Sequence, residues 1–564
     1  MGAKRGRAAL TIVFAALTST PARCFNVAAR ARLATNRARG LLTARAVRSA
    51  DLKRRARPVM ELSTVQETAA VTVPREGKLL RPPPKFEPKP YTYLQELTLR
   101  IESLTNMGEG VARDDGWVVM VPHVIPGELV KCKVFRNHQN YSEATLTEVL
   151  EPSPDRVEPA CPLFGLCGGC QYQHMQVDVQ RSWKRQQVVE VLTKLAGLEN
   201  PQVNPTIGTD ETFGYRSKIT PHYDKPRQGE IRAIGFQQVK FPTVFHQPDL
   251  GSVDLHKTVD VESCNIATPA INAALPDARR AAFEAVREAH RDGNSKKARK
   301  GAMLLFRETQ EGVVTDYKAE VSERVGDLVL HFKAGEFFQN NPHVLPKMVE
   351  HVVARAKEGG ARYLIDAYCG GGLFCLAASS SFERCAGIEI SAPAIDCATR
   401  NAALNGIDNC LFLAGTASNI FANAHFPGDE TVVIIDPPRK GCDSDFLKQL
   451  FKFKPARIVY VSCDPATQAR DTESIVGSGY VPEDIQPFDL FPQTRHIENV
   501  ITFSLAQPAA AGAAPASDRK RFKADAGADT GGAAAAEATG AAAAGAAAAA
   551  AAPAPAVAAE TAGS

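Results

Sequence analysis

The hydrophobic pattern of the second half of the chain alternates between helix-like and strand-like segments. "HVLPKMVEHVVARA" carries an apolar stripe with helical spacing, which predicts an amphipathic helix that packs on a sheet. The apolar runs in "RYLIDAYCGGGLFCLAA", "CAGIEIS", "TVVIIDPPRKG" and "RIVYVSCDP" predict four strands with helices between them. The pattern therefore predicts an α/β domain over residues 331–506, with a mostly parallel, doubly wound, Rossmann-like sheet.

The first half of the chain has a different pattern, with short strands separated by glycine and proline turns. Residues 91–151 contain alternating runs such as "LTLRIESL" and "SEATLTEVL", which predict a small five-stranded β-barrel of the OB type. Residues 152–330 mix the two patterns, and we expect a central α+β domain there.

Composition fits a globular protein of several domains. The 564 residues are 44% hydrophobic and 23% charged, and no apolar run is long enough to cross a bilayer, so we expect no stable membrane partner. Residues 1–50 contain ten Lys or Arg and no acid, which leaves 56 basic against 62 acidic residues in the remainder. Binding of nucleic acid would therefore need local basic patches.

Both ends of the chain differ from the folded part. The Arg-rich residues 1–60, with a short apolar core, predict an organelle-targeting peptide, for a plastid rather than a mitochondrion, with a mitochondrial presequence as the alternative. Residues 61–90 are expected to form a linker. The Ala- and Gly-rich residues 507–564 have too few large apolar side chains to form a core, and we expect a disordered tail.

Polar residues at the ends of the predicted strands suggest a nucleotide-like cofactor. Asp366 ends a strand that runs into Gly370–Gly372, and Glu389 ends the next strand, where an acid usually accepts ribose hydroxyls. The chain lacks G-x-G-x-x-G at this point, which favours S-adenosylmethionine (SAM) over NAD. A further strand ends in the turn Asp436-Pro-Pro, which would direct a carboxylate at a substrate base.

Cys463 stands where another strand must stop, directly before Asp464 and Pro465. A free cysteine is most often a small buried hydrophobe, and that reading is the alternative here. Ligands of doubly wound sheets bind at the carboxyl ends of the strands, however. The position of Cys463 therefore places its thiol where a ligand of such a sheet would bind.

Three further cysteines form a compact loop with the spacing C-x5-C-x2-C. Cys161, Cys167 and Cys170 lie in "CPLFGLCGGCQYQH", whose glycines allow the backbone to wrap closely around a metal. Zinc would take His174 as a fourth ligand, whereas an iron–sulfur cluster would take a fourth thiolate such as Cys264. The spacing predicts a metal site and leaves the metal open.

Two segments carry basic residues that suit RNA. The predicted barrel offers Lys131, Lys133, Arg136 and His138 for phosphate contacts. The segment "GYRSKITPHYD" places Tyr215 beside Arg216 and Lys218, and an aromatic ring between cations suits stacking and phosphate contacts. A strand with a charged face would look similar.

The motifs together resemble one family, the SAM-dependent RNA uracil-5 methyltransferases. The matching pieces run in order as "CPLFGLCGGCQYQH", "GYRSK", "FFQNNPHV", "LIDAYCGGGLF", "GIEIS", "IIDPPRKG", "YVSCDPATQARD" and "FPQTRHIENV". The stretch "SLTNMGEGVARDDGWVVMVPHVIPGELV" resembles the TRAM domain, a small RNA-binding barrel. The combination is most similar to the iron–sulfur subgroup that acts on large-subunit rRNA.

The resemblance implies a SAM-dependent Rossmann-like methyltransferase domain behind a TRAM barrel and a central iron–sulfur and RNA-binding domain. It implies a [4Fe–4S] cluster on Cys161, Cys167, Cys170 and Cys264, with zinc as the alternative metal, and SAM contacts from Gln339, Tyr368, Glu389 and Asp436. Cys463 would be the nucleophile and Glu498 the base, with Arg439, Arg470 and His496 as supports. Leu373 and Thr416 depart from the family pattern at cofactor contacts.

The implied reaction adds the Cys463 thiolate to carbon 6 of uracil, so that carbon 5 can take the methyl group before Glu498 removes its proton. The substrate is expected to be RNA with a flipped-out uridine, in rRNA rather than tRNA, and the protein is expected to be a monomer. An RNA-binding protein with a degenerate methyltransferase domain and an amino-group methyltransferase for bases are the alternatives.

Overall fold

The computed structural model of the chain describes residues 82, 86–239, 258–293, 300–415, 421 and 425–506. The predicted targeting peptide 1–60, most of the predicted linker 61–90, the predicted tail 507–564 and Thr416 lie outside the described residues. No helix in the described part of the chain is long and apolar enough to span a membrane.

The N-terminal part forms a six-stranded sheet in the order β1-β5-β6-β4-β3-β2, antiparallel except for the pair of β4 and β6. Its apolar side chains alternate inward along each strand, as Val119 and Val121 do in β4. The strands are β1 (Glu96–Arg100), β2 (Ser103–Leu104), β3 (Glu109–Asp114), β4 (Trp117–Pro122), β5 (Leu129–Asn137) and β6 (Tyr141–Glu151).

The barrel has one strand more than the five that the sequence predicts. The run "LTLRIESL" divides because its first part pairs with β5 and its last part with β3. The division falls at Ile101 and Glu102: Ile101 N–H donates to the Glu128 carbonyl, and Glu102 N–H donates to the Val111 carbonyl. A single hydrophobic run therefore forms two strands where the chain bends between two neighbours.

The described residues of the central segment form two long helices and three small sheets. The sheets have the orders β10-β9-β8-β11, β13-β12-β7 and β14-β15. The elements are α1 (Val177–Leu195), β7 (Lys218–Ile219), β8 (His222–Tyr223), β9 (Gly235–Gln237), β10 (Thr258–Asp260), α2 (Pro269–Arg291), β11 (Ala302–Met303), β12 (Phe306–Thr309), β13 (Gly312–Val314), β14 (Glu320–Val325) and β15 (Leu328–Lys333).

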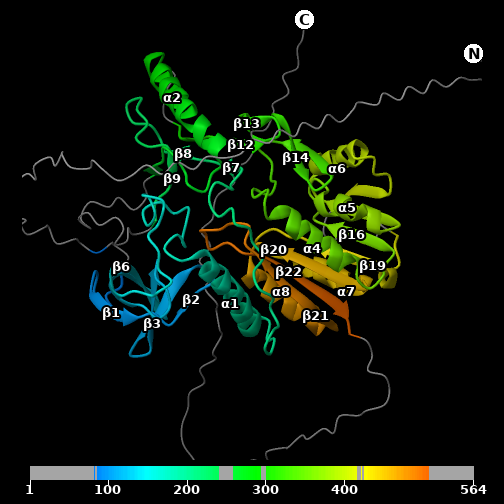
Figure 1. The fold of residues 1–564 in the computed structure, drawn as a ribbon, viewed down its shortest axis with the longest axis horizontal. Coiled ribbons are helices and arrows are strands. Elements are labelled where there is room, and N and C mark those ends of the chain that lie inside the picture. Colours follow the sequence, from blue (N-terminus) through cyan, green and yellow to red (C-terminus); the bar gives the residue numbers. More distant parts are fainter. Residues whose placement is uncertain are drawn as a thin grey trace, which may run out of the picture. The chain divides into compact units, whose positions relative to one another are not determined.

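The C-terminal part is a seven-stranded sheet in the order β18-β17-β16-β19-β20-β22-β21 (Figure 1). Strands β16 to β20 are parallel, and β22 runs antiparallel to β20. The strands are β16 (Tyr363–Ala367), β17 (Arg384–Glu389), β18 (Cys410–Ala414), β19 (Thr431–Ile435), β20 (Arg457–Ser462), β21 (Tyr480–Phe488) and β22 (Glu498–Leu505).

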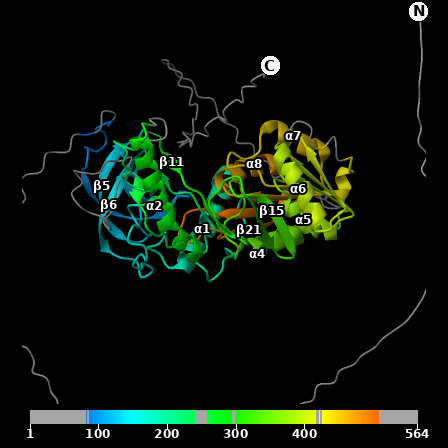
Figure 2. The ribbon, with the colours of Figure 1, turned by 90° about the horizontal axis from the view of Figure 1, so that it is seen from above.

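Helices cover both faces of this sheet, because its central strands are apolar on both sides. In β19, Val432 and Ile434 pack with α4 and α5, whereas Val433 and Ile435 pack with α1, α7 and α8. Figure 2 shows α5 and α6 beside β15. The helices are α4 (Leu345–Lys357), α5 (Leu373–Ala378), α6 (Ala392–Leu404), α7 (Ser444–Phe453) and α8 (Pro465–Gly477), with 3-10 turns at Ser379–Ser381 and Gly428–Glu430.

These elements confirm the predicted amphipathic helix and the mostly parallel, doubly wound sheet. The predicted stripe is the buried face of α4, where Met348, Val349 and Val352 contact the sheet. The order of the strands reverses between β16 and β19, and ligands of such sheets bind at that switch point.

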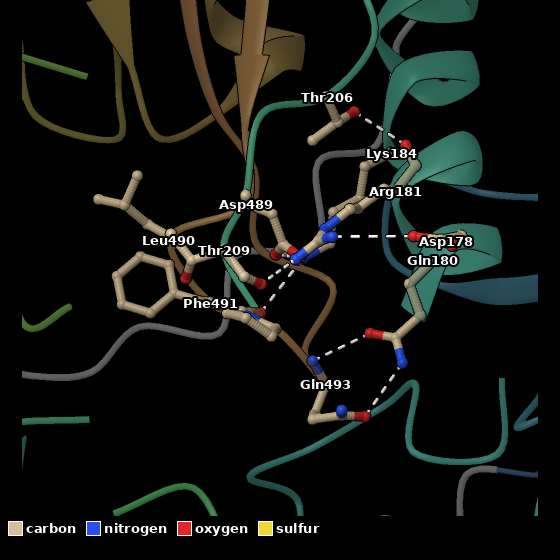
Figure 3. A network of polar contacts seen from close by, with 12 residues as sticks. Asp178, Gln180, Arg181, Lys184, Thr206, Thr209, Asp489, Leu490, Phe491 and Gln493 are labelled. Atoms are coloured by element: carbon tan, nitrogen blue, oxygen red, sulfur yellow. Dashed lines mark hydrogen bonds and ion pairs between the residues drawn. The ribbon is translucent and has the colours of Figure 1, made fainter. Parts of the chain in front are cut away.

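The helix α1 lies in the central segment of the sequence, yet it packs against α8 and β21 of the C-terminal sheet. Val188 and Leu192 belong to the same core as the sheet. Its first turns are joined by polar contacts to the segment 489–493 that leads into β22 (Figure 3). The contacts of α1 thus connect residues that are about 300 positions apart in sequence.

Candidate active site

The loop after β16 allows a ligand at the switch point to lie close to the backbone. Gly370 and Gly372 have φ angles of 52° and 91°, a region that side chains with a Cβ rarely adopt. Asp366 is fully buried, and its Oδ2 accepts a hydrogen bond of 2.9 Å from Cys375 N–H at the start of α5. The glycine loop is therefore fixed between a buried carboxylate and the following helix.

Glu389 ends β17 beside this loop. Its carboxylate accepts hydrogen bonds from Gly370 N–H at 3.3 Å and from Ser391 N–H at 3.0 Å. Both bonds hold the carboxylate at the strand end, and a carboxylate has further lone pairs for two hydroxyl groups. This geometry suits the predicted role of Glu389 in holding a ribose.

Tyr368 lies in the same loop with a φ angle of 69°, which is uncommon for a tyrosine. Its N–H donates to the Ile388 carbonyl at 2.9 Å, and its ring centroid lies 5.2 Å from that of Phe446. Burial raises the pKa of its hydroxyl, so the group stays neutral. The loop after β16 thus joins Tyr368 to the end of the strand that carries Glu389.

Gln339 approaches from a separate segment between β15 and α4. That segment is anchored on both sides: the Ser217 N–H donates to the Asn340 carbonyl at 2.9 Å, and the Asn341 side chain donates to the Leu490 carbonyl at 2.9 Å. Among the described residues, no hydrogen bond joins Gln339 to Tyr368, Glu389 or Asp436. The structure therefore groups Tyr368 with Glu389 and leaves Gln339 on the separate segment between β15 and α4.

The predicted nucleophile, Cys463, follows β20 directly and precedes α8. Asp464 begins the helix, with its Oδ1 accepting hydrogen bonds from Ala466 N–H at 3.0 Å and Thr467 N–H at 3.2 Å. Pro465 occupies the first helical turn, where no donor is needed. Because the strand must end there, Cys463 lies at the carboxyl edge of the sheet. Its side chain is half-buried.

Glu498 and Asp436 meet Cys463 at this edge. Asn499 pairs with Ser462 across β22 and β20, which places Glu498 beside the end of β20. Asp436 follows β19, the parallel neighbour of β20. Each carboxylate acts electrostatically on the Cys463 thiol. The sheet register therefore brings together three of the predicted residues from three strands.

Burial governs the protonation of this group. It raises the pKa of Cys463 to about 12, with further increases from Glu498 and Asp436, whereas the charge and hydrogen bonding of Arg439 lower it. Burial also raises the pKa of Asp436 to about 7. The pKa of Glu498 rises well above its usual value because of burial and Asp436, and Arg439 opposes this rise. Arg439 is thus the cation that acts on both the thiol and the base.

The other two supports have different surroundings. Arg470 donates to the Asp471 carboxylate at 2.7 Å and to the carbonyl of Lys440 at 2.9 Å, so it holds the turn after Asp436-Pro-Pro. His496 is neutral, because burial, followed by Arg439 and Arg495, lowers its pKa to about 3.

The four predicted cluster cysteines line one cavity of about 470 Å³. Cys161, Cys167 and Cys170 lie on the loop before α1, and Cys264 lies on the segment before α2. One contact joins these segments, because the Asn265 side chain donates to the Ala160 carbonyl at 3.1 Å. A second contact joins the cysteine loop to β9, where Gly168 N–H donates to the Gln237 carbonyl at 2.9 Å. The cavity is lined further by Arg216, Lys218, Asn340 and His496.

The geometry favours four cysteines over three cysteines and His174. The imidazole of His174 is buried, and its Nε2 lies 3.3 Å from the Val124 carbonyl, outside the lining of the cavity. Among the described residues, the one group of three His, Cys, Asp or Glu ligand atoms that lie within 4.8 Å of one another is formed by other cysteines. A tetrahedral zinc ion would hold its sulfurs about 3.8 Å apart, so this cavity suits a larger group that takes four thiolates.

Four of the residues expected to contact RNA, Lys131, Lys133, His138 and Tyr215, have partners within the protein. Tyr215 is fully buried, and its hydroxyl donates to the Pro492 carbonyl at 3.0 Å, so the expectation that it stacks on a base is wrong. Lys131 pairs with Glu148 at 2.8 Å, because the two strands place opposite charges side by side. Lys133 lies 3.9 Å from Glu96 and His138 lies 3.4 Å from Glu143, whereas Arg136 is exposed.

Sequence reasoning missed a buried polar network between α1 and the segment before Glu498 (Figure 3). Lys184 Nζ and Asp489 form an ion pair at 2.5 Å, and both side chains are fully buried. Gln180 and Gln493 exchange two hydrogen bonds of 3.0 Å. A signal was present in the sequence, because Gln180, Lys184, Gln187, Val188 and Leu192 form one helical stripe.

A comparison with solved structures supports the predicted fold. The crystal structure of Pyrococcus abyssi tRNA (uracil-54, C5)-methyltransferase in complex with S-adenosyl-L-homocysteine matches with a TM-score of 0.52. The match covers 72% of this chain and 100% of that one at 23% identity. The fold is therefore that of a methyltransferase with a Rossmann-like sheet, as the sequence predicts.

The sequence comparisons then give the family. The profile described as tRNA (Uracil-5-)-methyltransferase matches residues 303–427 and 428–505, and the TRAM domain profile matches residues 94–147. The tRNA (uracil(54)-C(5))-methyltransferase of Schizosaccharomyces pombe is 36% identical over 438 residues, 74% of this chain and 79% of the relative. The enzyme of the same name from Saccharomyces cerevisiae is 33% identical, with 71% and 72% covered.

The chain belongs to the RNA uracil-5 methyltransferase family and carries the TRAM domain. These findings confirm the predicted family and the class of enzyme, an RNA methyltransferase.

Proposed function

We propose that the protein methylates carbon 5 of a uridine in tRNA, with SAM as methyl donor and a covalent bond from Cys463 to carbon 6 of the base. The observation that carries this proposal is the meeting of Cys463, Glu498 and Arg439 at one edge of the sheet. A nucleophile and a base close together at one edge of the sheet are what carbon-5 methylation requires.

SAM would lie at the switch point, where it supplies an electrophilic methyl group. Glu389 is held in place to accept the ribose hydroxyls, and the glycine loop allows the backbone to approach the ligand. Tyr368 and Gln339 would contact the remainder of the molecule, and Asp436 lies between this site and Cys463. These roles follow the family resemblance and agree with the positions of Tyr368, Glu389 and Asp436 at the edge of the sheet.

The Cys463 thiol must lose its proton before it adds to carbon 6. Burial keeps the thiol protonated, and Arg439 is positioned to favour the thiolate. Addition to carbon 6 breaks the double bond between carbons 5 and 6 and makes carbon 5 nucleophilic. Carbon 5 can then take the methyl group of SAM, which would leave as S-adenosylhomocysteine with the electron pair of the broken sulfur–methyl bond.

Glu498 then completes the reaction. After methyl transfer, carbon 5 carries both the methyl group and its original proton. The Glu498 carboxylate takes this proton as the Cys463–carbon 6 bond breaks, which restores the double bond and releases the thiolate. The buried position of Glu498 raises its affinity for a proton, as a base for a carbon acid needs.

The relatives favour tRNA as the substrate. Both fungal relatives are named for uracil 54 of tRNA, and we propose the corresponding uridine here. The target base must leave its stack to reach the sheet edge, which costs a few kcal/mol and favours loops over duplexes. An rRNA substrate, expected from the resemblance, is the alternative to this proposal. The monomeric state and import into a plastid through residues 1–60 stay predictions.

A [4Fe–4S] cluster on Cys161, Cys167, Cys170 and Cys264 is part of this proposal. The cavity holds four thiols from two segments, which fits the four thiolates that such a cluster takes. Bound there, the cluster would crosslink the loop before α1 to the segment before α2. Its contribution would be to hold the shape of the central segment.

A covalent trap tests the proposal. The full chain, prepared without oxygen, is incubated with SAM and 5-fluorouridine-substituted tRNA, and denaturing gels are examined for a protein–RNA band. Fluorine cannot leave as a proton does, so the adduct should persist. We expect the band with the wild type and with the control Cys442→Ala, a buried cysteine on a neighbouring loop, and its loss in Cys463→Ala.

The same trap with rRNA fragments distinguishes the two substrates. A band with tRNA alone supports our proposal, and a band with rRNA alone contradicts the choice of tRNA while it preserves the chemistry. If RNA binds but neither RNA is trapped, Cys463 is not the nucleophile. In that case, methylation of an amino group or RNA binding without catalysis would explain the protein better.

A further inference from the structure

Three thiols outside the cysteine-lined cavity converge in the methyltransferase domain. They belong to Cys375 in α5, Cys385 in β17 and Cys410 in β18. Their sulfur atoms all lie within 4.8 Å of one another. None of these residues has a role in the proposed reaction.

Sheet register and helix packing explain the convergence. Cys385 and Cys410 are direct partners on the parallel strands β17 and β18. Side chains of paired residues point to the same face, and α5 packs on β17 and places Cys375 over this pair. Each of the three elements thus contributes one sulfur to the same point.

Packing of small apolar residues explains burial but not this arrangement. Cys375 and Cys385 belong to an apolar core, as free cysteines often do. An apolar core requires only that side chains fill its volume. It does not require that three sulfur atoms from separate elements face one another. Cys410 is only half-buried and lies in an edge strand, so the group is at the border of the core and not at its centre.

The spacing of the sulfurs fits a metal ion. A metal–sulfur distance of about 2.3 Å places the sulfurs about 3.8 Å apart in a tetrahedral site and about 4.0 Å apart in a trigonal one. In the described part of the chain, no fourth His, Cys, Asp or Glu ligand atom joins the group. Thiolates select soft ions such as Cu⁺ and also bind Zn²⁺, which usually takes four ligands.

We propose that Cys375, Cys385 and Cys410 form a binding site for one thiophilic metal ion, Cu⁺ in preference to Zn²⁺. The ion would join α5 to the two strands that it covers. Since the glycine loop directly precedes α5 and Glu389 ends β17, the ion would brace the elements that frame the cofactor site. An ion that binds only the folded protein raises its stability by mass action.

A competition titration tests this site. The full chain with its iron–sulfur cluster reconstituted is titrated anaerobically with Cu⁺ against a chromophoric chelator, and a second series uses Zn²⁺. We expect the wild type to bind one equivalent more Cu⁺ than Cys410→Ser, and to show a larger rise in melting temperature on binding. The difference between the two proteins is the readout, because the cavity-lining cysteines are the same in both.

Cys132→Ser is the matched control, since Cys132 is a buried cysteine in the TRAM barrel, and it should bind Cu⁺ as the wild type does. Cys385→Ala is a second test variant in case Cys410→Ser does not fold, as judged by circular dichroism. X-ray absorption at the copper edge should show three sulfur neighbours in the wild type. A Cys410-dependent site that takes only Zn²⁺ supports the metal site and overturns the preference for Cu⁺. Equal uptake by the wild type and both variants overturns the site itself.

Discussion

At the scale of single residues, the proposed chemistry depends on four ionisable groups at one edge of the sheet, of which Glu498 is the most buried. Cys463, Glu498 and Asp436 all have raised pKa values, and Arg439 is the cation that acts on the first two. Resting enzyme therefore keeps a neutral thiol, and burial favours the protonated form of Glu498. The active forms of both groups are the deprotonated ones, so the reaction should gain from higher pH.

Replacement of Glu498 by Gln should stall the reaction after methyl transfer. The adduct still forms, because Cys463 is intact, but the carbon-5 proton has no acceptor, and turnover should fall by about 10²- to 10⁴-fold. Quenched reactions with ordinary uridine tRNA should then show a protein–RNA adduct that the wild type does not accumulate. Glu473→Gln, an exposed carboxylate on α8, is the control and should keep full turnover. Loss of adduct in Glu498→Gln would instead assign Glu498 to an earlier step.

The rate of adduct formation should rise with pH. The thiol has a pKa raised to about 12, so its thiolate fraction grows about tenfold per pH unit throughout the range below that value. Single-turnover trapping with 5-fluorouridine tRNA between about pH 6 and 9 measures this slope. A flat profile would contradict the thiol as the group whose deprotonation limits the rate.

Arg439→Ala should slow adduct formation at every pH in this range. Loss of a nearby positive charge raises the thiol pKa further, and a change of one to two units corresponds to about a ten- to hundredfold loss. Arg439→Lys should recover part of the rate, because it restores the charge. The neighbouring Lys440→Ala, an exposed side chain, should leave the rate unchanged.

At the scale of elements, α1 holds the segment that leads into Glu498. Lys184 of α1 and Asp489 are both fully buried and lie 2.5 Å apart. Burial lowers the pKa of Lys184, and Asp489 opposes this change. A buried charge that loses its partner is costly, so this pair constrains how α1 lies against the sheet.

Lys184→Met should lower the free energy of unfolding by about 3–5 kcal/mol, because it leaves Asp489 buried without its main partner. Denaturant unfolding measures the change. On the same helix, Lys194→Met removes an exposed pair with Glu190 and should change the free energy of unfolding by less than about 1 kcal/mol. The double variant Lys184→Met with Asp489→Leu should recover most of the loss; a double variant as unstable as the single one would contradict the role of the charge pair.

At the scale of the whole molecule, the cysteine-lined cavity joins segments that lie about a hundred residues apart. Cys264→Ala should therefore reduce the iron content of anaerobically reconstituted protein from about four atoms per chain to a small remainder. The affinity for SAM should be retained, because the proposed cofactor site lies at the edge of the seven-stranded C-terminal sheet. The control variant Cys132→Ala should contain as much iron as the wild type. If the Cys264→Ala variant also contains as much iron as the wild type, Cys264 is not a ligand of the cluster. Iron analysis and SAM titration on the same samples measure both results.

The sequence predicted the elements whose pattern is local. The period of apolar residues is enough to identify α4 and the four parallel strands, because one face or both faces of each element must be buried. Cys463 could be placed at a strand end because Asp464 and Pro465 stop the strand. Glu498 was found only through the family resemblance, since no local pattern marks it as a base.

Only the tertiary structure decided which distant segments pair with each other. The sequence predicted that Tyr215 stacks on an RNA base. Its ring is buried instead, and its hydroxyl donates a hydrogen bond to the Pro492 carbonyl, because the side chain packs against the segment before β22. The buried pair of Lys184 and Asp489 and the three sulfurs around Cys385 follow from sheet register and helix docking. A one-dimensional pattern shows which side chains must be buried, but the residues that they meet are fixed only when the elements pack.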